Sequence, residues 1–277
     1  MKLAARALAV FAAVVAVACQ SGDSASDTAP APAAGCSGTV LFGRPNAKTG
    51  LDDTQCQPRC TCSGVTFEAP LYGQADIDAL LAWKQLDPPA MLSADPYASP
   101  APDVGSPDRV CAVVRGAEPK TYRVQTFESE AAAKAAGAIP THYGPCGLCS
   151  SLANLAVYMR YPDLTAPVRD CGLKGVSGDA AAQLACIGAL GFEPPCAQIW
   201  SYNTDATRAA CFDTCISVLG KPYHQEDGSL NACLQCDEDK SGPVFKAVAG
   251  RTRRNTGLGN ALCRPCSEVR PLLHHYD

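Results

Sequence analysis

The sequence predicts an α+β fold that is rich in helix, with a disulfide-stapled globular body and a small cysteine-rich part at its N-terminal side. Three observations support this prediction. The chain of 277 residues contains 17 cysteines, a composition typical of exported proteins that are held together by disulfides. Most periodic segments place apolar residues at helical spacing. Two short segments, 110–114 and 121–127, are instead rich in Val, Thr, Tyr and Phe, as strands are.

The expected helices follow from apolar spacing and from the residues at their ends. Ser129 can cap one helix, which Gly137 ends. Another helix places Leu152, Leu155 and Met159 on one side. The full set of expected helices is 75–86, 129–136, 149–159, 179–190, 205–219 and 244–253.

Prolines divide the body of the chain into two parts. Six prolines interrupt residues 87–108, which we interpret as a linker. It separates a small cysteine-rich module, 36–86, from a larger helix-rich and disulfide-stapled domain, 109–277. From residue 36 on, four cysteines precede the linker and twelve follow it. Because both counts are even, each part could close its own disulfides.

The first 18 residues have the features of a secretory signal peptide. Lys2 and Arg6 precede an apolar run from Ala7 to Ala18, and small residues lead into Cys19. The apolar run is too short for a permanent membrane span. We therefore expect residues 1–18 to be removed and the remaining chain to fold outside the cytosol.

The segment Ala16-Val17-Ala18-Cys19 resembles the lipobox of bacterial lipoproteins, although that family usually has Leu, Val or Ile where this chain has Ala16. The resemblance implies that Cys19 is lipidated and that acyl chains anchor the protein stably in a membrane. Gln20 stands where an inner-membrane retention signal would often place Asp, so the resemblance implies the outer membrane or cell surface. Ordinary cleavage after Ala18 is the alternative, but it would leave an unpaired thiol.

Residues 19–35 are expected to form a disordered tether between the lipidated Cys19 and the body. The segment from Gln20 to Gly35 contains Ser, Gly, Asp, Thr, Ala and Pro and no large apolar side chain. Such a segment buries too little surface to offset the entropy lost on ordering. It would hold the body away from the membrane.

Charge and spacing exclude several classes of function. The net charge of −4 gives no general attraction to nucleic acid. Haem attachment requires His directly after a Cys-x-x-Cys pair, and Ser150, Asp237 and Ser267 stand there instead. Zinc is disfavoured because thiols exported to an oxidising compartment form disulfides. We therefore expect no cofactor and no metal. The expected partners are a membrane, through the lipid anchor, and an unidentified ligand or protein.

The candidate catalytic residues are Cys146 and Cys149, which precede an expected helix. The positive end of a helix dipole stabilises a thiolate. Cys146 could attack and Cys149 resolve in thiol–disulfide exchange, an arrangement similar to that of thioredoxin-like proteins. Cys-Gly-x-Cys also resembles papain-like hydrolases, which would make Cys149 the nucleophile. Its base would then be one of three histidines, His224, His274 or His275.

A structural interpretation of these cysteines is favoured over both enzymes. The same spacing recurs at Cys233–Cys236 and Cys263–Cys266, and a spacing used three times in a cysteine-rich chain is more often framework than catalyst. Cys211 and Cys215 lie on one face of an expected helix, too far apart to bond to each other. They should bridge to different partners and fix this helix to two neighbours.

One basic cluster is a candidate anion site. Arg251, Arg253 and Arg254 could bind a phosphate, a carboxylate or an acidic sugar. The favoured alternative is that these arginines, with Lys246, pair with the carboxylates of residues 237–239 at a helix end. The terminal His274-His275-Tyr276 could chelate a metal, but a loose tail is favoured.

The sequence therefore favours a secreted, lipid-anchored envelope lipoprotein with a structural or ligand-binding role. Thiol–disulfide exchange through Cys146 and Cys149 is the enzymatic alternative, and hydrolysis by Cys149 is the weaker one.

Overall fold

The computed structural model describes residues 35–36 and 39–276. The expected signal peptide, its lipidated Cys19 and nearly all of the expected tether lie outside the described residues. Everything below concerns the described part of the chain, which belongs to one compact unit.

A four-stranded sheet has the order β5-β7-β6-β8. Its central strand β6 is almost entirely buried, and it pairs antiparallel with β7 and with β8, with an irregularity between Cys111 and Ala112. The short β5 adds parallel to β7. β6 and β7 match the two expected strands, because β-branched and aromatic residues suit a pleated, half-buried surface. The strands are β5 (Lys84–Gln85), β6 (Val110–Arg115), β7 (Thr121–Phe127) and β8 (Ile139–Tyr143).

The N-terminal described residues form two small sheets. β1 (Leu41–Phe42) pairs parallel with β2 (Cys56–Gln57), and β3 (Arg59–Cys62) forms a hairpin with β4 (Val65–Glu68). The hairpin turn consists of Ser63 and Gly64, both with positive φ, which matches the twist of the strands it joins.

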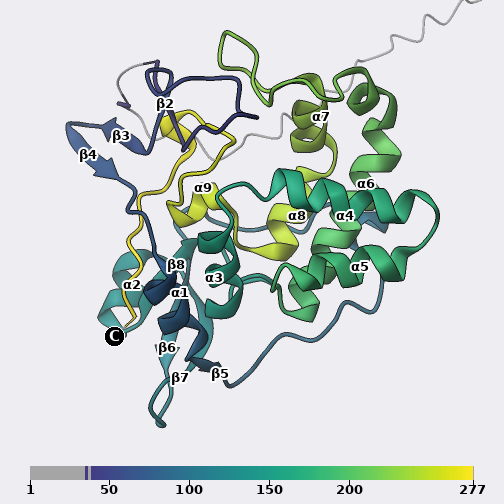
Figure 1. The fold of residues 1–277 in the computed structure, drawn as a ribbon. Coiled ribbons are helices and arrows are strands. Elements are labelled where there is room, and N and C mark those ends of the chain that lie inside the picture. Colours follow the sequence, from purple (N-terminus) through teal and green to yellow (C-terminus); the bar gives the residue numbers. More distant parts are fainter. Residues whose placement is uncertain (1–34, 37–38, 277) are drawn as a thin grey trace, which may run out of the picture. The chain divides into compact units, whose positions relative to one another are not determined.

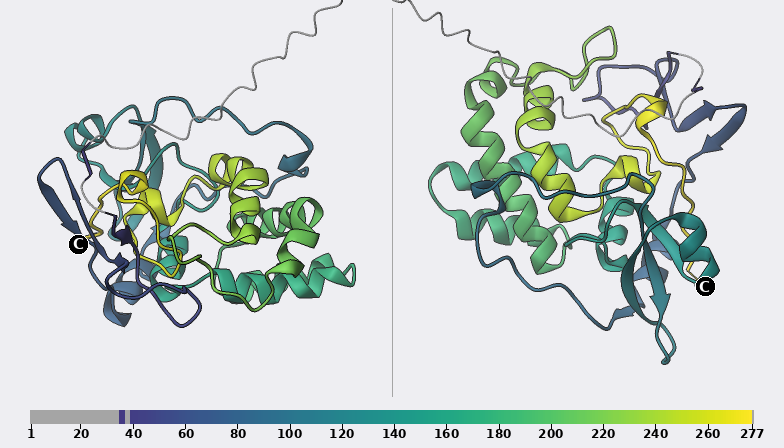
Figure 2. Two further views of the ribbon diagram at one scale, coloured as in Figure 1. Left: turned by 90° about the horizontal axis from the view of Figure 1, so that it is seen from above. Right: turned by 180° about the vertical axis from the view of Figure 1, so that it is seen from behind.

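Helices make up most of the remaining regular secondary structure (Figure 1). Helices α1, α2 and α3 lie near the four-stranded sheet, whereas α4 to α8 gather on the other side of the fold, as both views of Figure 2 also show. The helices are α1 (Gln74–Leu81), α2 (Glu130–Ala135), α3 (Leu152–Arg160), α4 (Thr165–Val176), α5 (Ala180–Ala189), α6 (Pro194–Ser217), α7 (Ala232–Lys240), α8 (Gly242–Ala249) and α9 (Arg253–Thr256), with 3₁₀ turns η1 (Pro96–Ala98) and η2 (Cys266–Glu268).

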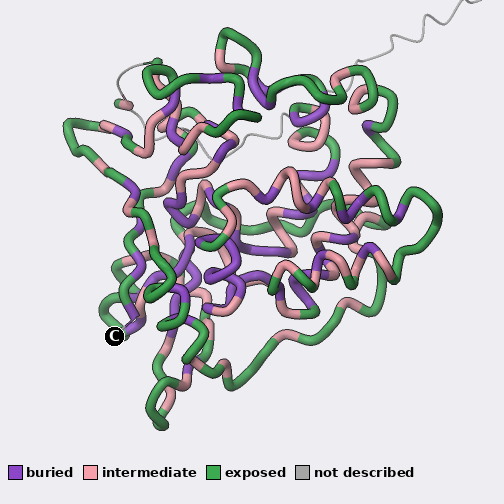
Figure 3. The backbone as a smooth tube through the Cα atoms, viewed as in Figure 1, coloured by how far each residue is buried: buried purple, intermediate pink, exposed green. Residues whose placement is uncertain are grey.

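The main core joins the sheet to the helices. Val113 and Tyr122 of the sheet, Leu155 of α3, and Ile187 and Ile199 of α5 and α6 are all buried in one cluster. Figure 3 shows buried stretches in the interior strands and helices, and exposed backbone along the connecting loops. The sequence prediction of a helix-rich α+β fold is thus confirmed.

Capping residues explain which helix boundaries were correctly expected. Ser129 accepts a hydrogen bond from the backbone N–H of Ala132 at the start of α2, and Asp179 does the same for Ala182 at the start of α5. α6 begins eleven residues earlier than expected. Its first two residues are Pro194 and Pro195, and proline, which interrupts a helix interior, fits the first turn.

Three other expected helix boundaries were wrong, and three helices were not expected. The helix expected over 75–86 ends at Leu81, α3 begins at Leu152 rather than at Cys149, and α8 ends at Ala249. The unexpected helices are α4, α7 and the short α9, and the strands β1 to β5 and β8 were not expected either.

The segment 87–108 is anchored on α6. The backbone of Leu92 exchanges hydrogen bonds of 2.7 and 3.1 Å with the side chain of Gln198, and the hydroxyl of Tyr97 donates to Asn203 at 2.7 Å. This proline-rich segment therefore runs across the helical side of the fold in a fixed position.

Eight disulfides use all sixteen cysteines of the described residues, and two of them cross the proline-rich segment. Cys56 and Cys60 bond to cysteines near the C-terminus, so the expectation that each part closes its own bridges is wrong. The physical reason is that β1 lies beside the C-terminal segment, where the backbones of Phe42 and Arg264 bond to each other. The pairs are Cys36–Cys62, Cys56–Cys263, Cys60–Cys266, Cys111–Cys146, Cys149–Cys196, Cys171–Cys186, Cys211–Cys236 and Cys215–Cys233.

The two cysteines on one face of α6 bond to different partners, as expected. Cys211 bonds to Cys236 and Cys215 bonds to Cys233. Both partners lie on α7, however, so these bridges fix α6 to one neighbouring helix and not to two. The spacing of four residues on α6 matches the spacing of three on α7, because both separations place side chains on one helix face.

Candidate functional site

Cys146 and Cys149 are bonded to distant parts of the chain and not to each other. Cys146 bonds to Cys111 of β6, and Cys149 bonds to Cys196 of α6. Cys149 is fully buried. Thiol–disulfide exchange between this pair requires a bridge that the two residues can form together, and hydrolysis requires a free thiolate. The structure contains neither a Cys146–Cys149 bridge nor a free Cys149 thiolate. It therefore supports the interpretation that both cysteines belong to the disulfide framework.

Arg251 is an internal structural group and not an open anion site. Its side chain is fully buried and donates hydrogen bonds to the carbonyl oxygens of Thr141, Cys149 and Ser150 and to the hydroxyl of Thr141, over 2.7–3.0 Å. Burial lowers the pKa of Arg251 to about 10. The guanidinium thus ties β8, the start of α3 and the end of α8 together, and the expected anion site is wrong at this residue.

Arg253 and Arg254 also have partners within the protein. Arg253 is buried, donates to the carbonyl oxygen of Tyr161 and lies over the ring of Tyr158. Arg254 pairs with Glu238 at 2.7 Å and with Glu268 at 2.6 Å. An anion would have to displace these contacts, so the structure favours the alternative of internal pairing.

Glu238 of α7 is the centre of this charge cluster. It accepts hydrogen bonds from Lys246 at 2.9 Å, Arg254 at 2.7 Å and Arg264 at 2.5 Å. Burial alone would raise the pKa of Glu238, but the three cations outweigh that effect and lower it. The expected pairing of Lys246 and Arg254 with a carboxylate of residues 237–239 is confirmed at Glu238.

The C-terminal residues are packed into the protein, so the expectation of a loose tail is wrong. His274 and Tyr276 are buried, and Nε2 of His274 lies 2.9 Å from the carbonyl oxygen of Thr256. The Tyr276 hydroxyl donates to the hydroxyl of Thr141 at 3.0 Å. Burial, helped by the charge of Arg251, lowers the pKa of His274 to about 3.

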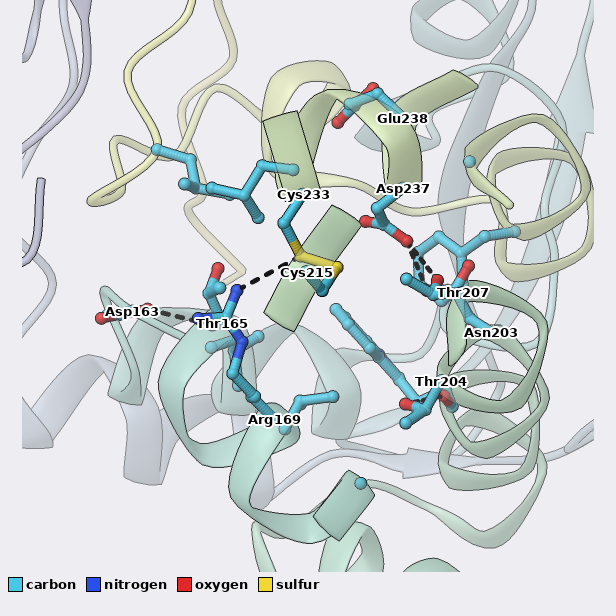
Figure 4. A pocket seen from close by; sticks show the side chains of 18 of the residues that line it. Asp163, Thr165, Arg169, Asn203, Thr204, Thr207, Cys215, Cys233, Asp237 and Glu238 are labelled. Carbon is cyan, nitrogen blue, oxygen red and sulfur yellow. Dashed lines mark hydrogen bonds between the residues drawn. A yellow bond between two sulfur atoms is a disulfide. The ribbon is translucent and has the colours of Figure 1, made fainter. Parts of the chain in front are cut away.

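A cleft on the helical side of the fold is the candidate functional site. It has a volume of about 340 Å³ and lies between α4, α6, α7 and α8 and the segment 252–264. Figure 4 shows side chains from these elements converging on it around the Cys215–Cys233 disulfide. The volume falls at the lower end of the range of roughly 300–1,000 Å³ for small-molecule sites.

The rim of the cleft exposes large apolar side chains. Leu173 and Val176 of α4 are 65% and 56% exposed, Phe212 and Ile216 of α6 are 49% and 54% exposed, and Leu219, just after the end of α6, is 69% exposed. All five line the cleft. Scattered exposed apolar residues are ordinary, but a group gathered around one opening indicates a binding surface.

The inner wall of the cleft is also mainly apolar. Trp200 of α6 and Phe245 of α8 contribute their rings, whose centroids lie 4.6 Å apart, and Leu164, Val168 and Leu234 lie beside them. These side chains give a ligand an apolar surface that already exists in the folded protein.

Polar side chains also line the cleft, and the carboxylates among them have hydrogen-bond partners within the protein. Asp237 accepts hydrogen bonds from Thr207 at 2.5 Å and Ser241 at 2.7 Å. Asp163 accepts from the backbone N–H of Thr165 and from the hydroxyl of Tyr223. These hydrogen bonds fix the orientation of the carboxylates without a ligand.

Three lining groups are less well satisfied. Oδ1 of Asn260 and Nε1 of Trp200 are buried and have no hydrogen-bond partner among the described residues. Arg169 of α4 points across the cleft toward the Cys215–Cys233 disulfide in Figure 4, and its guanidinium lies 4.0 Å from Sγ of Cys233. A buried acceptor and an open cation are groups that a ligand can satisfy.

The cleft could not be located from the sequence, because α4 was not expected and exposure depends on tertiary packing. One signal was present: Phe212 and Ile216 of α6 and Leu219, just after the helix, are apolar residues at helical spacing in the sequence. They are separate from the Cys211 and Cys215 positions that face α7. A helix with two such groups of residues has more apolar surface than one neighbour can cover.

Comparison with protein families gives a match to part of the chain. Residues 180–271 match a family of unknown function, DUF8771. The matched segment includes α6, α7 and α8, which line the cleft, whereas α4 precedes it. Comparisons with curated proteins and with solved structures found no match.

The described residues give two further results that bear on function. No group of His, Cys, Asp and Glu side chains within them is arranged to hold a metal ion. Among the same residues, no helix has both the length and the apolar character that crossing a membrane requires.

Proposed function

We propose that this protein is an exported, lipid-anchored protein of the cell envelope whose body binds a small, mainly apolar ligand in the cleft between α4 and α6. The observation that carries the binding role is the group of five exposed apolar side chains around a cleft of about 340 Å³. Removing this apolar surface from water would favour a ligand by about 25 cal/mol per Å² buried.

The disulfides support the proposed compartment. Sixteen cysteines in eight pairs are typical of a chain that folds in an oxidising environment. The bridges between α6 and α7 hold two walls of the cleft together. A binding site is thereby formed before the ligand arrives, which lowers the entropy cost of binding.

Titration with an uncharged naphthylamine dye tests the binding role. The dye fluoresces in apolar surroundings and should bind the wild-type protein. Leu173→Asp and Ile216→Asp place a carboxylate on the rim of the cleft and should weaken dye binding about tenfold or more, as expected for losing a buried Leu or Ile contact. Both positions are exposed, so the fold should survive.

Leu71→Asp is the matched control, because Leu71 is 75% exposed and lies outside the cleft. It should leave dye binding unchanged. Failure of the wild-type protein to bind the dye would refute the proposal, as would equal weakening by Leu71→Asp and Ile216→Asp.

Phase separation in a nonionic detergent tests the anchor independently of the cleft. The wild-type protein, made in a bacterium that processes lipoproteins, should enter the detergent phase, and Cys19→Ser should leave it in the aqueous phase, because one acylated residue supplies the attachment. An aqueous wild-type protein would refute lipid anchoring.

A further inference from the structure

Two cations of the cleft lining, Arg169 and Arg253, form no ion pair with a carboxylate among the described residues. Arg253 is buried, donates to the carbonyl oxygen of Tyr161 and lies over the ring of Tyr158, so it is already engaged within the protein. Lys246, Arg254 and Arg264 share Glu238, and Arg208 pairs with Asp205. Arg169 forms no such ion pair, and its one side-chain contact with hydrogen-bonding geometry is a weak one, 4.0 Å from Sγ of Cys233. It is therefore the cation most available to an incoming anion.

No carboxylate of the described residues takes the place of an anion beside Arg169. Asp163 lies at the same end of the cleft, but its two oxygens accept hydrogen bonds from Thr165, Ala166 and Tyr223. The lining as a whole contains six Lys and Arg residues and three Asp and Glu residues, although the net charge of the chain is −4. The cleft is thus a positively charged site on an acidic protein, and it complements a negative group.

The shape of the arginine side chain limits which negative groups can bind to it. The planar guanidinium presents paired N–H donors that match the oxygens of a carboxylate or a phosphate. Partial burial between α4 and the Cys215–Cys233 disulfide removes water that would otherwise solvate the charge, so an anion at this position gains more than one at the open surface.

The apolar rim sets the shape of the rest of the ligand. Leu173 and Val176 follow Arg169 along α4 by four and seven residues, so Val176 lies about 10 Å along the helix axis from Arg169. Phe212 and Ile216 contribute from α6, and Leu219 contributes from the residues just after it. A ligand that contacts both the cation and this rim needs one negative end and an apolar portion at least that long.

On the basis of the proposed binding role of the cleft, we propose that the ligand is an anionic amphiphile with a single apolar chain. Its headgroup, a carboxylate or a phosphate, binds Arg169, and its chain lies along the exposed apolar side chains of α4 and α6. The headgroup chemistry is shared by fatty acids and by single-chain phospholipids, and the cleft accepts one chain within its volume of about 340 Å³.

Displacement of the uncharged dye by three matched amphiphiles tests this proposal. The three are dodecanoate, dodecyl phosphate and dodecanol, which share a chain and differ in the headgroup. At least one of the anions should bind the wild-type protein about 10- to 100-fold more tightly than dodecanol does, the range expected for charged hydrogen bonds. Whichever anion binds more tightly identifies the headgroup.

Arg169→Gln should remove this difference and leave dodecanol binding unchanged. Lys174→Gln is the matched control, because Lys174 is an exposed cation on the same helix that does not line the cleft. It should preserve the preference for the anion. Arg169→Lys, which keeps the charge but loses the paired donors, should retain part of the preference.

Several results would overturn the proposal while leaving the binding role intact. These are dye binding that none of the amphiphiles displaces, equal affinity of the wild-type protein for dodecanol and both anions, and equal weakening of all three amphiphiles by Arg169→Gln. The last result would show that Arg169 only maintains the cleft. If the wild-type protein does not bind the dye, the binding role itself fails.

Discussion

Cys60 is bonded to Cys266, 206 residues further along the chain, and the adjacent bridge Cys56–Cys263 closes almost the same loop. Because the two bridges lie side by side, either one keeps the ends of this loop together. The second bridge then closes only a short ring. The N-terminal hairpin is in this way part of the same disulfide framework as the C-terminal segment.

This arrangement predicts strongly non-additive effects of removing the two bridges. In the chain-entropy model, the bridge that closes the long loop raises the free energy of unfolding by about 5 kcal/mol, and the bridge that closes the short ring raises it by about 2–3 kcal/mol. Replacing both cysteines of one bridge with Ala should therefore lower the free energy of unfolding by about 2–3 kcal/mol. Removing both bridges should cost about 3 kcal/mol more than the sum of the two separate losses. Denaturant unfolding measures this, and simple additivity would contradict the prediction.

Mapping the disulfides of the native protein tests the assignment of Cys146 and Cys149. Alkylation before denaturation should modify neither residue. Mass spectrometry of proteolytic fragments should then recover Cys111 linked to Cys146, and Cys149 linked to Cys196. A fragment with Cys146 bonded to Cys149 would contradict the structural interpretation and revive thiol–disulfide exchange.

Arg251 is predicted to be among the most sensitive single positions for stability. Arg251→Met would leave the carbonyl oxygens of Thr141, Cys149 and Ser150 without their donor in the interior. Such a loss should lower the free energy of unfolding by about 3–5 kcal/mol. Arg123→Met is the control, because Arg123 is an exposed side chain paired with Asp87 at the surface, and it should cost less than about 1 kcal/mol. Urea unfolding of the two variants gives the comparison, and equal losses would be inconsistent with a structural role for Arg251.

The buried histidines predict a loss of stability in mild acid. Burial lowers the pKa of His274 to about 3 and also lowers the pKa of His142. As pH falls below about 6.5, the unfolded chain therefore binds protons that the folded protein does not. Each such histidine contributes stability that is present above that pH and is lost by up to about 1.4 kcal/mol per pH unit below it.

The free energy of unfolding, measured between pH 7 and pH 5, reports the contribution of the histidines separately from that of Glu238. The pKa of that carboxylate is lowered in the folded state, so its contribution to stability is lost only below an unfolded-state pKa of about 4.3. His274→Asn should reduce the slope of stability against pH in this window. His275→Asn, at an exposed position, should leave the slope unchanged. Identical slopes for the wild-type protein and His274→Asn would contradict the prediction.

The sequence predicted the local elements better than their connections. Ser129 predicted the start of one helix because capping depends on a side chain and a backbone N–H within three residues. The disulfide pairs were inaccessible, since sixteen cysteines allow very many pairings and spacing does not choose among them. Pro194 and Pro195 concealed the first turns of α6, because proline indicates a break as often as a beginning.

The predictions for the candidate sites were wrong or correct according to how much they depended on tertiary structure. Arg251 looked like a surface cation because sequence does not show that three carbonyl oxygens converge on it in the interior. The pairing of Arg254 with Glu238 was predicted because the arginines were expected at the negative end of the helix over 244–253, close in sequence to the three carboxylates of residues 237–239. The cleft depends on α4 lying opposite α6, a relationship between segments that have no shared motif.

Photocrosslinking tests the central claim, that the cleft binds a single-chain anionic amphiphile, most directly. A dodecanoate analogue with a diazirine in its chain would be irradiated with the native protein, and the labelled peptides would be identified by mass spectrometry. The label should lie in residues 165–176 and 204–219, should be prevented by excess dodecanoate or dodecyl phosphate, and should decrease in Arg169→Gln. Labelling scattered over the surface, or concentrated on the four-stranded sheet, would contradict the account.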